Sequence, residues 1–277
     1  MSDKWRIYFS DRNDRGYSVP YYIDVEPGNP SKILKPKSEP ILSTGTLGSF
    51  DHAGVMPTNI VTLPSGVKYM YYIGWSQRLD VPYHNTIGLA VSDDGDSWRK
   101  LSTGPVFGTS IKEPGYTGTI CVMPNYYSGP WQAWYLSCRE WVEIAGRIEP
   151  KYTINYATSP DGIDWDPGRV CIELQDNEGG ISQASVLYDD NYKMYFSVRD
   201  VSNYRKGGAG SYRIEYAESD DGRHWSRKGE CLVKSETGWD SEMVSYPNVF
   251  DYEGERYMFY NGNNFGQTGV GYAKATI

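Results

Sequence analysis

Four acidic residues stand at the entrances to apolar, strand-like segments, where their carboxyl groups could do acid/base chemistry. They are Asp51, Glu178, Asp240 and Glu242. A positioned carboxylic acid can donate a proton to a leaving oxygen, while a second, ionised carboxylate acts as base or nucleophile. The sequence therefore predicts that a catalytic set lies among these four residues.

Three arginines occupy a second recurring position, just after segments rich in aromatic residues. Arg12, Arg139 and Arg199 all stand there. Because a guanidinium group is planar and presents paired donors, a cluster of arginines suits a carboxylate or phosphate on a ligand. Further candidates for ligand contact are Trp75, Tyr116, Asn261, His52 and His84. Both histidines are also explained by local hydrogen bonding.

Internal repeats indicate which elements must position these residues. Residues 89–98, 156–165 and 216–225 match one another, each with a strand-like run, an Asp-Gly pair and then a tryptophan. The Asp-Gly pair favours a turn between two strands because glycine adopts a positive φ readily. We interpret these aspartates as turn formers rather than as metal ligands or catalytic groups.

Each match is preceded by an aromatic strand and, before that, by another apolar strand. A repeat of about four strands is the size of one propeller blade. Both ends of the chain hold partial copies, and no segment has a sustained helical period. The sequence predicts an all-β fold, a single five-bladed β-propeller over residues 1–277, whose first blade lacks its own innermost strand.

Composition narrows the classes of partner. The chain has 27 basic and 35 acidic residues, a formal charge of −8, which argues against binding to nucleic acid. No apolar run approaches the roughly 20 residues that span a bilayer, and the first residues lack a secretory signal, so a cytoplasmic location is expected. Four cysteines without a CxxC spacing and only three histidines argue against a zinc site. No residue set predicts another metal site or a cofactor.

The order of several motifs resembles a known superfamily. Residues 50–57, 71–75, 88–95 and 238–243 resemble the five-bladed propellers of glycoside hydrolase families 43, 62, 32, 68, 117 and 130, and are closest to a bacterial branch with little assigned function. The resemblance covers nearly the whole chain. It implies a glycosidase-like enzyme that acts on a small, anionic sugar or sugar conjugate.

The resemblance also implies roles for the acidic residues. Asp51 is expected to be the ionised partner and Glu242 the general acid, with Asp240 and Glu178 in reserve. Glycosidic cleavage needs a proton donor on one side of the bond and a carboxylate on the other. The arginines would hold the substrate, and the aromatic residues would offer flat faces to sugar rings.

Several alternatives remain open at this stage. The usual base of these hydrolases sits on the strand that the first blade lacks, which favours a non-hydrolytic transferase or tailoring enzyme as a rival. A catalytically silent carbohydrate-binding module is another. Asp51 could instead close a turn, and Asp240 and Glu242 could join a structural ion network. The open strand position also predicts a homodimer.

Overall fold

The computed structural model describes residues 3–205 and 207–277. Within these ranges the chain forms strands β1 to β18 and one four-residue helix, α1. The prediction of an all-β chain is confirmed. The residues divide into two compact units, the first made of residues 3–111, 116–131 and 159–165, and the second of residues 112–115, 132–158, 166–205 and 207–277. The prediction of a single domain stays a prediction.

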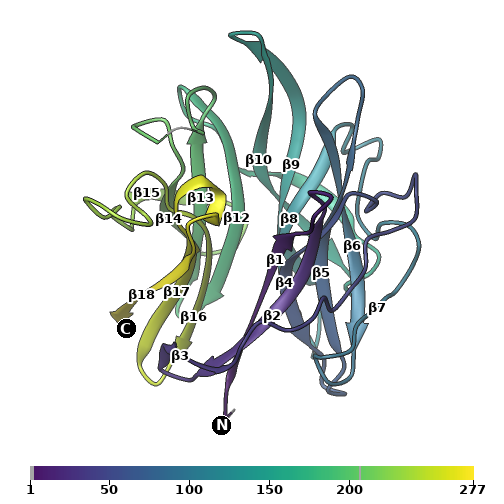
Figure 1. The fold of residues 1–277 in the computed structure, drawn as a ribbon, viewed down its shortest axis with the longest axis vertical. Helices are drawn as coiled ribbons and strands as arrows, with labels where there is room; N and C mark the ends of the chain where they lie inside the picture. Colours follow the sequence, from purple (N-terminus) through teal and green to yellow (C-terminus); the bar gives the residue numbers. More distant parts are fainter. Residues whose placement is uncertain (1–2, 206) are drawn as a thin grey trace. The chain divides into compact units, whose positions relative to one another are not determined.

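The first unit contains one sheet in which successive strands lie side by side (Figure 1). The strands of this sheet are β1 (Trp5–Arg12), β2 (Ser18–Glu26), β3 (Asn29–Lys35), β4 (Gly54–Thr62), β5 (Lys68–Gln77), β6 (Tyr83–Ser92) and β7 (Arg99–Lys100). The unit also contains β8 (Tyr116–Met123), which is not part of this sheet. Strands β1 to β3 pair in antiparallel order, as do β4 to β7. A single parallel bridge between Ser18 and Gly54 joins β2 to β4.

The second unit repeats the same antiparallel pattern. Its strands are β9 (Trp131–Ile144, with Trp131 in the first unit), β10 (Arg147–Ser159, with Ser159 in the first unit), β11 (Asp166–Ile172), β12 (Glu178–Tyr188), β13 (Tyr192–Asp200), β14 (Arg213–Ser219), β15 (Ser226–Glu230), β16 (Ser245–Tyr252), β17 (Glu255–Asn261) and β18 (Val270–Thr276). Helix α1 (Asn263–Gly266) lies between the last two strands. Strands β12 to β15 follow one another across a sheet, and β16 to β18 form a further sheet.

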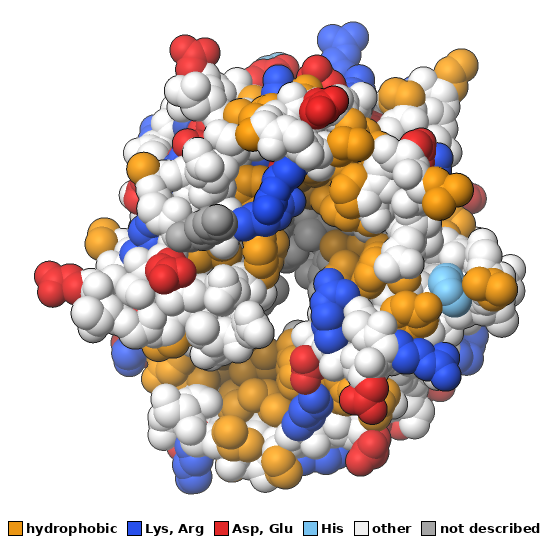
Figure 2. All heavy atoms as spheres, turned by 45° about the horizontal axis from the view of Figure 1, so that its top comes forward, with side chains coloured by type: hydrophobic (Ala, Val, Ile, Leu, Met, Phe, Trp, Pro, Cys, Tyr) orange, Lys and Arg blue, Asp and Glu red, His pale blue; other side chains and the backbone are white. Residues whose placement is uncertain are grey.

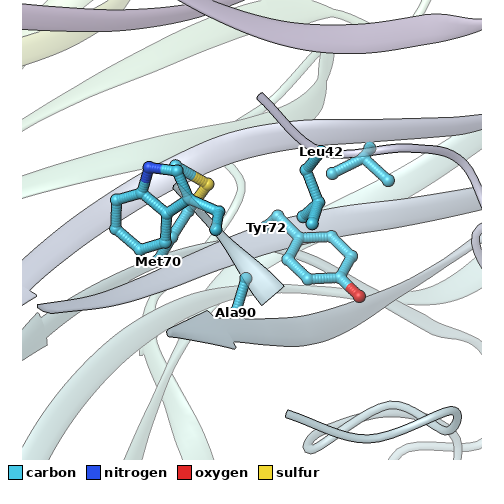
Figure 3. Packing of buried hydrophobic residues seen from close by; sticks show 6 residues of the cluster. Leu42, Met70, Tyr72 and Ala90 are labelled. Carbon is cyan, nitrogen blue, oxygen red and sulfur yellow. The ribbon is translucent and has the colours of Figure 1, made fainter. Parts of the chain in front are cut away.

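Aromatic strands supply much of the core. In the first unit, Tyr72 and Met70 of β5 pack with Leu42, Val55, Ala90 and Trp98. Figure 3 shows Tyr72 beside Leu42, with its hydroxyl directed away from Met70. In the second unit, Ile214, Val244, Val249, Met258 and Tyr260 form a comparable cluster. Met70, Tyr71 and Tyr72 of β5 are all buried, because successive side chains point to opposite faces of the sheet and both faces are packed.

The Asp-Gly turns have one recurring geometry. Asp161 Oδ1 accepts hydrogen bonds from the backbone N–H groups of Ile163 and Asp164 and from Ser159 Oγ. The tryptophan that follows, Trp165, donates its indole N–H to the carbonyl of Gly162. The other two copies repeat these bonds around Asp94 and Asp221. The interpretation of these aspartates as turn formers is confirmed.

Bulges interrupt the first strand of several repeats. The pairing register shifts between Pro57 and Asn59 in β4 and between Ser182 and Ser185 in β12. Asn59 Oδ1 accepts a hydrogen bond of 3.1 Å from the backbone of Val122 in β8, and Ser185 Oγ accepts one of 2.9 Å from Val249 in β16. Each bulge therefore directs a polar side chain onto the first strand of the next repeat.

Candidate functional site

A tyrosine contacts a buried carboxylate at the start of three of the repeats. The hydroxyl of Tyr72 in β5 lies 3.1 Å from Asp51 Oδ2, and that of Tyr260 in β17 lies 2.9 Å from Asp240 Oδ2. Burial, together with the adjacent carboxylate, raises the pKa of both tyrosines, so each hydroxyl keeps its proton and donates it to the hydrogen bond. We call this arrangement the tyrosine–carboxylate latch.

Local sequence explains the two aspartate latches. An aromatic residue precedes each aspartate and stacks on the tyrosine: Phe50 on Tyr72 with ring centroids 6.1 Å apart, and Trp239 on Tyr260 at 5.2 Å. Two residues after each tyrosine stands a glycine, Gly74 or Gly262. A Cβ atom at either glycine would lie 2.4 Å from the stacked aromatic ring. The aromatic-Asp pair and the Tyr-x-Gly pattern therefore form one packing unit.

Asp51, the predicted ionised partner, is enclosed in the first unit. Its side chain is 2% exposed, and Lys100 Nζ lies 2.5 Å from Oδ2. Ser49 Oγ donates to Oδ1 at 3.0 Å. Both carboxylate oxygens therefore already have donors, and the role of Asp51 as the ionised partner stays a prediction. This geometry also fits the alternative in which Asp51 closes the turn before β4.

Sequence reasoning missed Glu113, which forms the third latch. This fully buried residue accepts hydrogen bonds from Tyr135 at 2.6 Å and Asn155 at 3.2 Å, and a further one from Ser137. Its position could have identified it, because Glu113 stands three residues before the first residue of β8, as Asp51 does before β4. Arg139, a predicted binding residue, lies 3.3 Å from Glu113 and stays 47% exposed.

Glu178 lies in an ion network instead of a latch. Phe196 occupies the strand position that the latch tyrosines hold elsewhere, and Arg213 and Arg227 contact Glu178 Oε1 at 3.0 and 2.7 Å. Burial has the largest single effect and raises the pKa of Glu178, but the hydrogen bonds from Arg227 and Gln175 and the charges of Arg227 and Arg213 together lower it, so the net shift is downward. Arg227 also pairs with Glu215, and Arg213 pairs with Glu215, Asp200 and Glu230, so four carboxylates including Glu178 surround the two arginines. Glu178 is therefore held ionised and enclosed.

Asp240 differs from the other latch carboxylates. It is 3% exposed, and its Oδ1 atom is buried without a hydrogen-bond partner among the described residues. A buried carboxylate oxygen without a donor is uncommon, because desolvation is then uncompensated. Oδ1 can accept a hydrogen bond from water or from a ligand hydroxyl that reaches it.

Glu242 lies on the same loop and is exposed. Its carboxylate has no partner within residues 3–205 and 207–277, whereas its backbone is firmly held. Asn263 Oδ1 accepts hydrogen bonds from the N–H groups of Glu242 and Met243, at 2.8 and 3.0 Å. Asn263 Nδ2 donates to the carbonyl of Gly238 at 3.0 Å. The structure thus brings Asp240 and Glu242 together on one clamped loop.

The three predicted arginines have different surroundings. Arg199 is fully buried and donates to Tyr152 and to the carbonyls of Pro150 and Asp200. Its guanidinium also lies over the ring of Tyr204, 4.1 Å from the ring centre. Burial opposes the charge of Arg199, but the surrounding tyrosines raise its pKa overall. In this structure Arg199 organises aromatic side chains rather than facing a ligand.

The remaining predicted binding residues lie mostly in the first unit. Arg12 is exposed and lies 5.3 Å from the ring centre of Trp75. His84 contacts Thr109 at 3.2 Å and packs edge-on against Tyr116, and burial lowers its pKa.

Two further predicted binding residues, His52 and Asn261, make hydrogen bonds within the protein. His52 Nε2 is 3.4 Å from the hydroxyl of Tyr17, while its Nδ1 is buried with no partner in the described ranges. In the second unit, Asn261 donates to the carbonyl of Phe265 at 3.2 Å. Asn261 therefore supports the turn that holds Glu242.

The surface charges, acidic and histidine side chains and helices of the described residues can be compared with what polyanions, metal ions and membranes require. Figure 2 shows acidic and basic side chains interspersed over the face in view. The described residues contain no group of histidine, cysteine, aspartate or glutamate side chains arranged to hold a metal ion. No helix in the described ranges has the length and apolar character needed to cross a bilayer.

Comparison with known proteins reveals two similar sequences. No family model matches the chain. The uncharacterized protein MT1551 of Mycobacterium tuberculosis strain CDC 1551 / Oshkosh is 36% identical over 276 residues, covering 98% of this chain and 88% of that protein. The uncharacterized protein Rv1502 of strain ATCC 25618 / H37Rv is 35% identical over the same coverage.

Solved structures share the fold at low sequence identity. A glycosyl hydrolase from Bacteroides ovatus has a TM-score of 0.74 at 13% identity and covers 100% of this chain and 82% of its own. A structure from the GH130 family of mannoside phosphorylases and glycoside hydrolases has a TM-score of 0.72 at 15% identity, with coverage of 100% and 82%. A GH32 β-fructofuranosidase from Bombyx mori scores 0.66 at 13% identity, with coverage of 96% and 53%. The predicted resemblance to propeller-type glycoside hydrolases is confirmed at the level of fold.

Proposed function

Since the chain belongs to the same family as the Mycobacterium tuberculosis proteins Rv1502 and MT1551, and has the fold of propeller-type glycoside hydrolases, we propose that it is a carbohydrate-active enzyme of the glycosidase type. The observation that carries this proposal is Glu242, an exposed carboxylate on a backbone that Asn263 clamps. A rigidly held acid with a free side chain is what proton transfer to a leaving oxygen needs.

Asp240 is the second carboxylate of the proposal. Its Oδ2 accepts a hydrogen bond from Tyr260, and its Oδ1 is buried and has no donor among the described residues, which leaves an acceptor position for a water or a sugar hydroxyl that reaches it. Asp51 remains the sequence-based prediction for the ionised partner, although its three donors also support a structural role. Glu178 has no oxygen to offer, because both oxygens are bonded to arginines.

The finer points of the proposal concern substrate and architecture. An anionic sugar is supported by Arg139, which is half exposed, and not by Arg199, which is buried. Five blades are supported by five successive groups of strands along the chain, namely β1–β3, β4–β7, β8–β11, β12–β15 and β16–β18. The first group begins with the aromatic strand β1.

Activity assays on matched variants test the assignment. A panel of aryl glycosides, including uronides, should reveal a substrate for the wild-type chain. Glu242→Gln keeps the shape of the side chain but removes its acidity, so turnover should fall by roughly 10²–10⁴-fold while the unfolding midpoint stays unchanged. Retention of full turnover by Glu242→Gln would refute the role of this residue.

A catalytically silent carbohydrate-binding module is the second candidate. The observation that favours it is that Asp51 and Glu178 are both committed to internal ion pairs. Sugar binding without release of product from any glycoside, in the wild-type chain and in Glu242→Gln alike, would select this candidate. Product in which the sugar has been transferred rather than released would select the non-hydrolytic enzyme.

A further inference from the structure

The turn that clamps Glu242 also holds an aromatic ring in an unusual backbone conformation. Asn264 and Phe265 have φ, ψ of 52°, 44° and 62°, 29°, so two consecutive residues other than glycine adopt the left-handed region. For a bulky residue such as phenylalanine this conformation is rare and unfavourable. Strain of this kind is retained where the surrounding contacts enforce it, and it gathers at binding sites.

Contacts on both sides of the turn fix the ring of Phe265 beside the Glu242 loop. The backbone N–H of Phe265 points at Met243 Sδ at 3.4 Å, and its carbonyl accepts from Asn261. Its ring packs against Tyr204 and Tyr212, with ring centroids 6.5 and 5.9 Å away and interplanar angles of 81° and 77°. Tyr204 and Tyr212 are buried, whereas Phe265 remains 38% exposed.

The space beside Glu242 is bordered by a glycine. Gly207 has φ of 76°, and a Cβ atom there would lie 3.0 Å from Glu242 Cβ. The backbone of Gly207 therefore lies against the side chain of Glu242, and a side chain at this position would crowd it. An apolar ring face and an acid are thus presented from adjacent segments of the second unit.

We propose that Phe265 is a sugar-stacking residue, on which one face of a pyranose ring lies beside Glu242. The C–H groups on one face of a pyranose are weakly positive, and the face of an aromatic ring is negative, so the two attract while apolar surface is buried. The inference rests on the proposed function, because it names the class of ligand as one with such a C–H face. Asn263 fixes the backbone of Glu242 and Asn261 fixes the backbone of Phe265, so the acid and the ring keep their relative positions.

Four variants distinguish a role of Phe265 in sugar stacking from a role in stabilising the fold. Phe265→Tyr keeps the aromatic face, Phe265→Leu keeps apolar bulk alone, and Phe265→Gly removes the ring while relieving the left-handed strain. Glu242→Gln removes the acid but leaves the ring. Binding of methyl glycosides, including a methyl uronide, is measured by saturation-transfer NMR and titration, and stability by thermal unfolding.

We expect the tyrosine and Glu242→Gln variants to bind within about threefold of wild type. The leucine and glycine variants should bind roughly tenfold or more weakly, the scale of a lost aromatic contact. Phe265→Gly should unfold at the wild-type temperature or above, which separates lost binding from lost folding. Unchanged binding by the leucine and glycine variants, or no binding of any methyl glycoside by the wild-type chain, would overturn the inference.

The two proposals fail in distinguishable ways. Binding that depends on Phe265 in a wild-type chain that hydrolyses no glycoside would leave the stacking residue standing and remove the glycosidase. Hydrolysis that depends on Glu242 but is indifferent to Phe265→Leu would do the reverse.

Discussion

At the scale of single residues, a carboxylate's partners decide what it can do. Asp51 and Glu178 were both predicted from their positions at strand entrances, and both lie there. The sequence could not show that Lys100 and Tyr72 enclose Asp51, because these partners come from distant positions in the chain. Sequence position therefore identified the carboxylates but not which of them keep a free oxygen.

Replacement of Asp51 tests its structural role. Asp51→Asn should lower the free energy of unfolding by about 2–4 kcal/mol, because Lys100 then keeps a largely buried charge without its partner. Tyr72→Phe, which removes one hydrogen bond, should cost about 1 kcal/mol. Urea denaturation measures both. Loss of turnover in Asp51→Asn with wild-type stability would instead restore Asp51 as the ionised catalytic partner.

Asp24 gives the first unit a dependence on pH. Hydrogen bonds from Arg6, and then from Lys4, lower the pKa of Asp24 from 3.8 to about 2. Because the pKa is lower in the folded state, the stabilisation is complete above about pH 4 and is lost as the pH falls towards 2. It amounts to roughly 2 kcal/mol.

The comparison with Asp24→Asn isolates this effect from other acidic groups. Urea unfolding midpoints of the two proteins should differ most at neutral pH and converge as the pH approaches 2. A constant difference between pH 6 and pH 2 would contradict the assignment.

At the scale of elements, the repeated turns were the most predictable feature. The sequence around Asp94, Asp161 and Asp221 determines the turn by itself, because the acceptor, the donors and the glycine lie within a few residues. Glu113 was missed because Lys112 precedes it, whereas an aromatic residue precedes Asp51 and Asp240, and because its partner Tyr135 lies on a separate strand, β9. Hydrogen bonds within a turn can be predicted from sequence, whereas contacts between residues on different strands cannot.

Removal of a turn acceptor should affect stability without affecting activity. Asp161→Ala deletes the acceptor of three hydrogen bonds and should lower the free energy of unfolding by about 1–2 kcal/mol. Asp161→Asn keeps an oxygen in place and should cost less than half as much. Chemical denaturation and an activity assay on the same preparations check both points. Equal losses in the two variants would show that charge, not hydrogen bonding, matters at this turn.

At the scale of the whole molecule, the fold was more accessible to sequence than the reaction. Repeats of aromatic and apolar strands led to the all-β fold and its resemblance to glycoside hydrolases. The count of five blades and the homodimer stay predictions, and sedimentation at micromolar concentration tests the latter. Catalytic roles were less predictable because they depend on which carboxylate oxygens lack a donor after folding, as Asp240 Oδ1 and the Glu242 carboxylate do within the described residues.

The charge of the whole chain makes a prediction about nucleic acids. With 35 acidic and 27 basic residues, the protein repels polyanions on average. A fluorescently labelled DNA duplex should show no rise in anisotropy with micromolar protein at 50 mM salt, where counterion release favours binding most. Binding that weakens steeply with added salt would contradict this expectation and reveal a basic surface.

The tyrosine–carboxylate latch has a consequence for evolutionary comparison. Asp51 and Glu113 serve folding through Tyr72 and Tyr135, so natural selection should keep them invariant even in relatives that have lost every enzymatic activity. Glu242 takes no part in a latch, and its side chain can drift freely once catalysis is lost. Among relatives, invariance at Glu242 rather than at Asp51 will therefore mark the lineages that remain active.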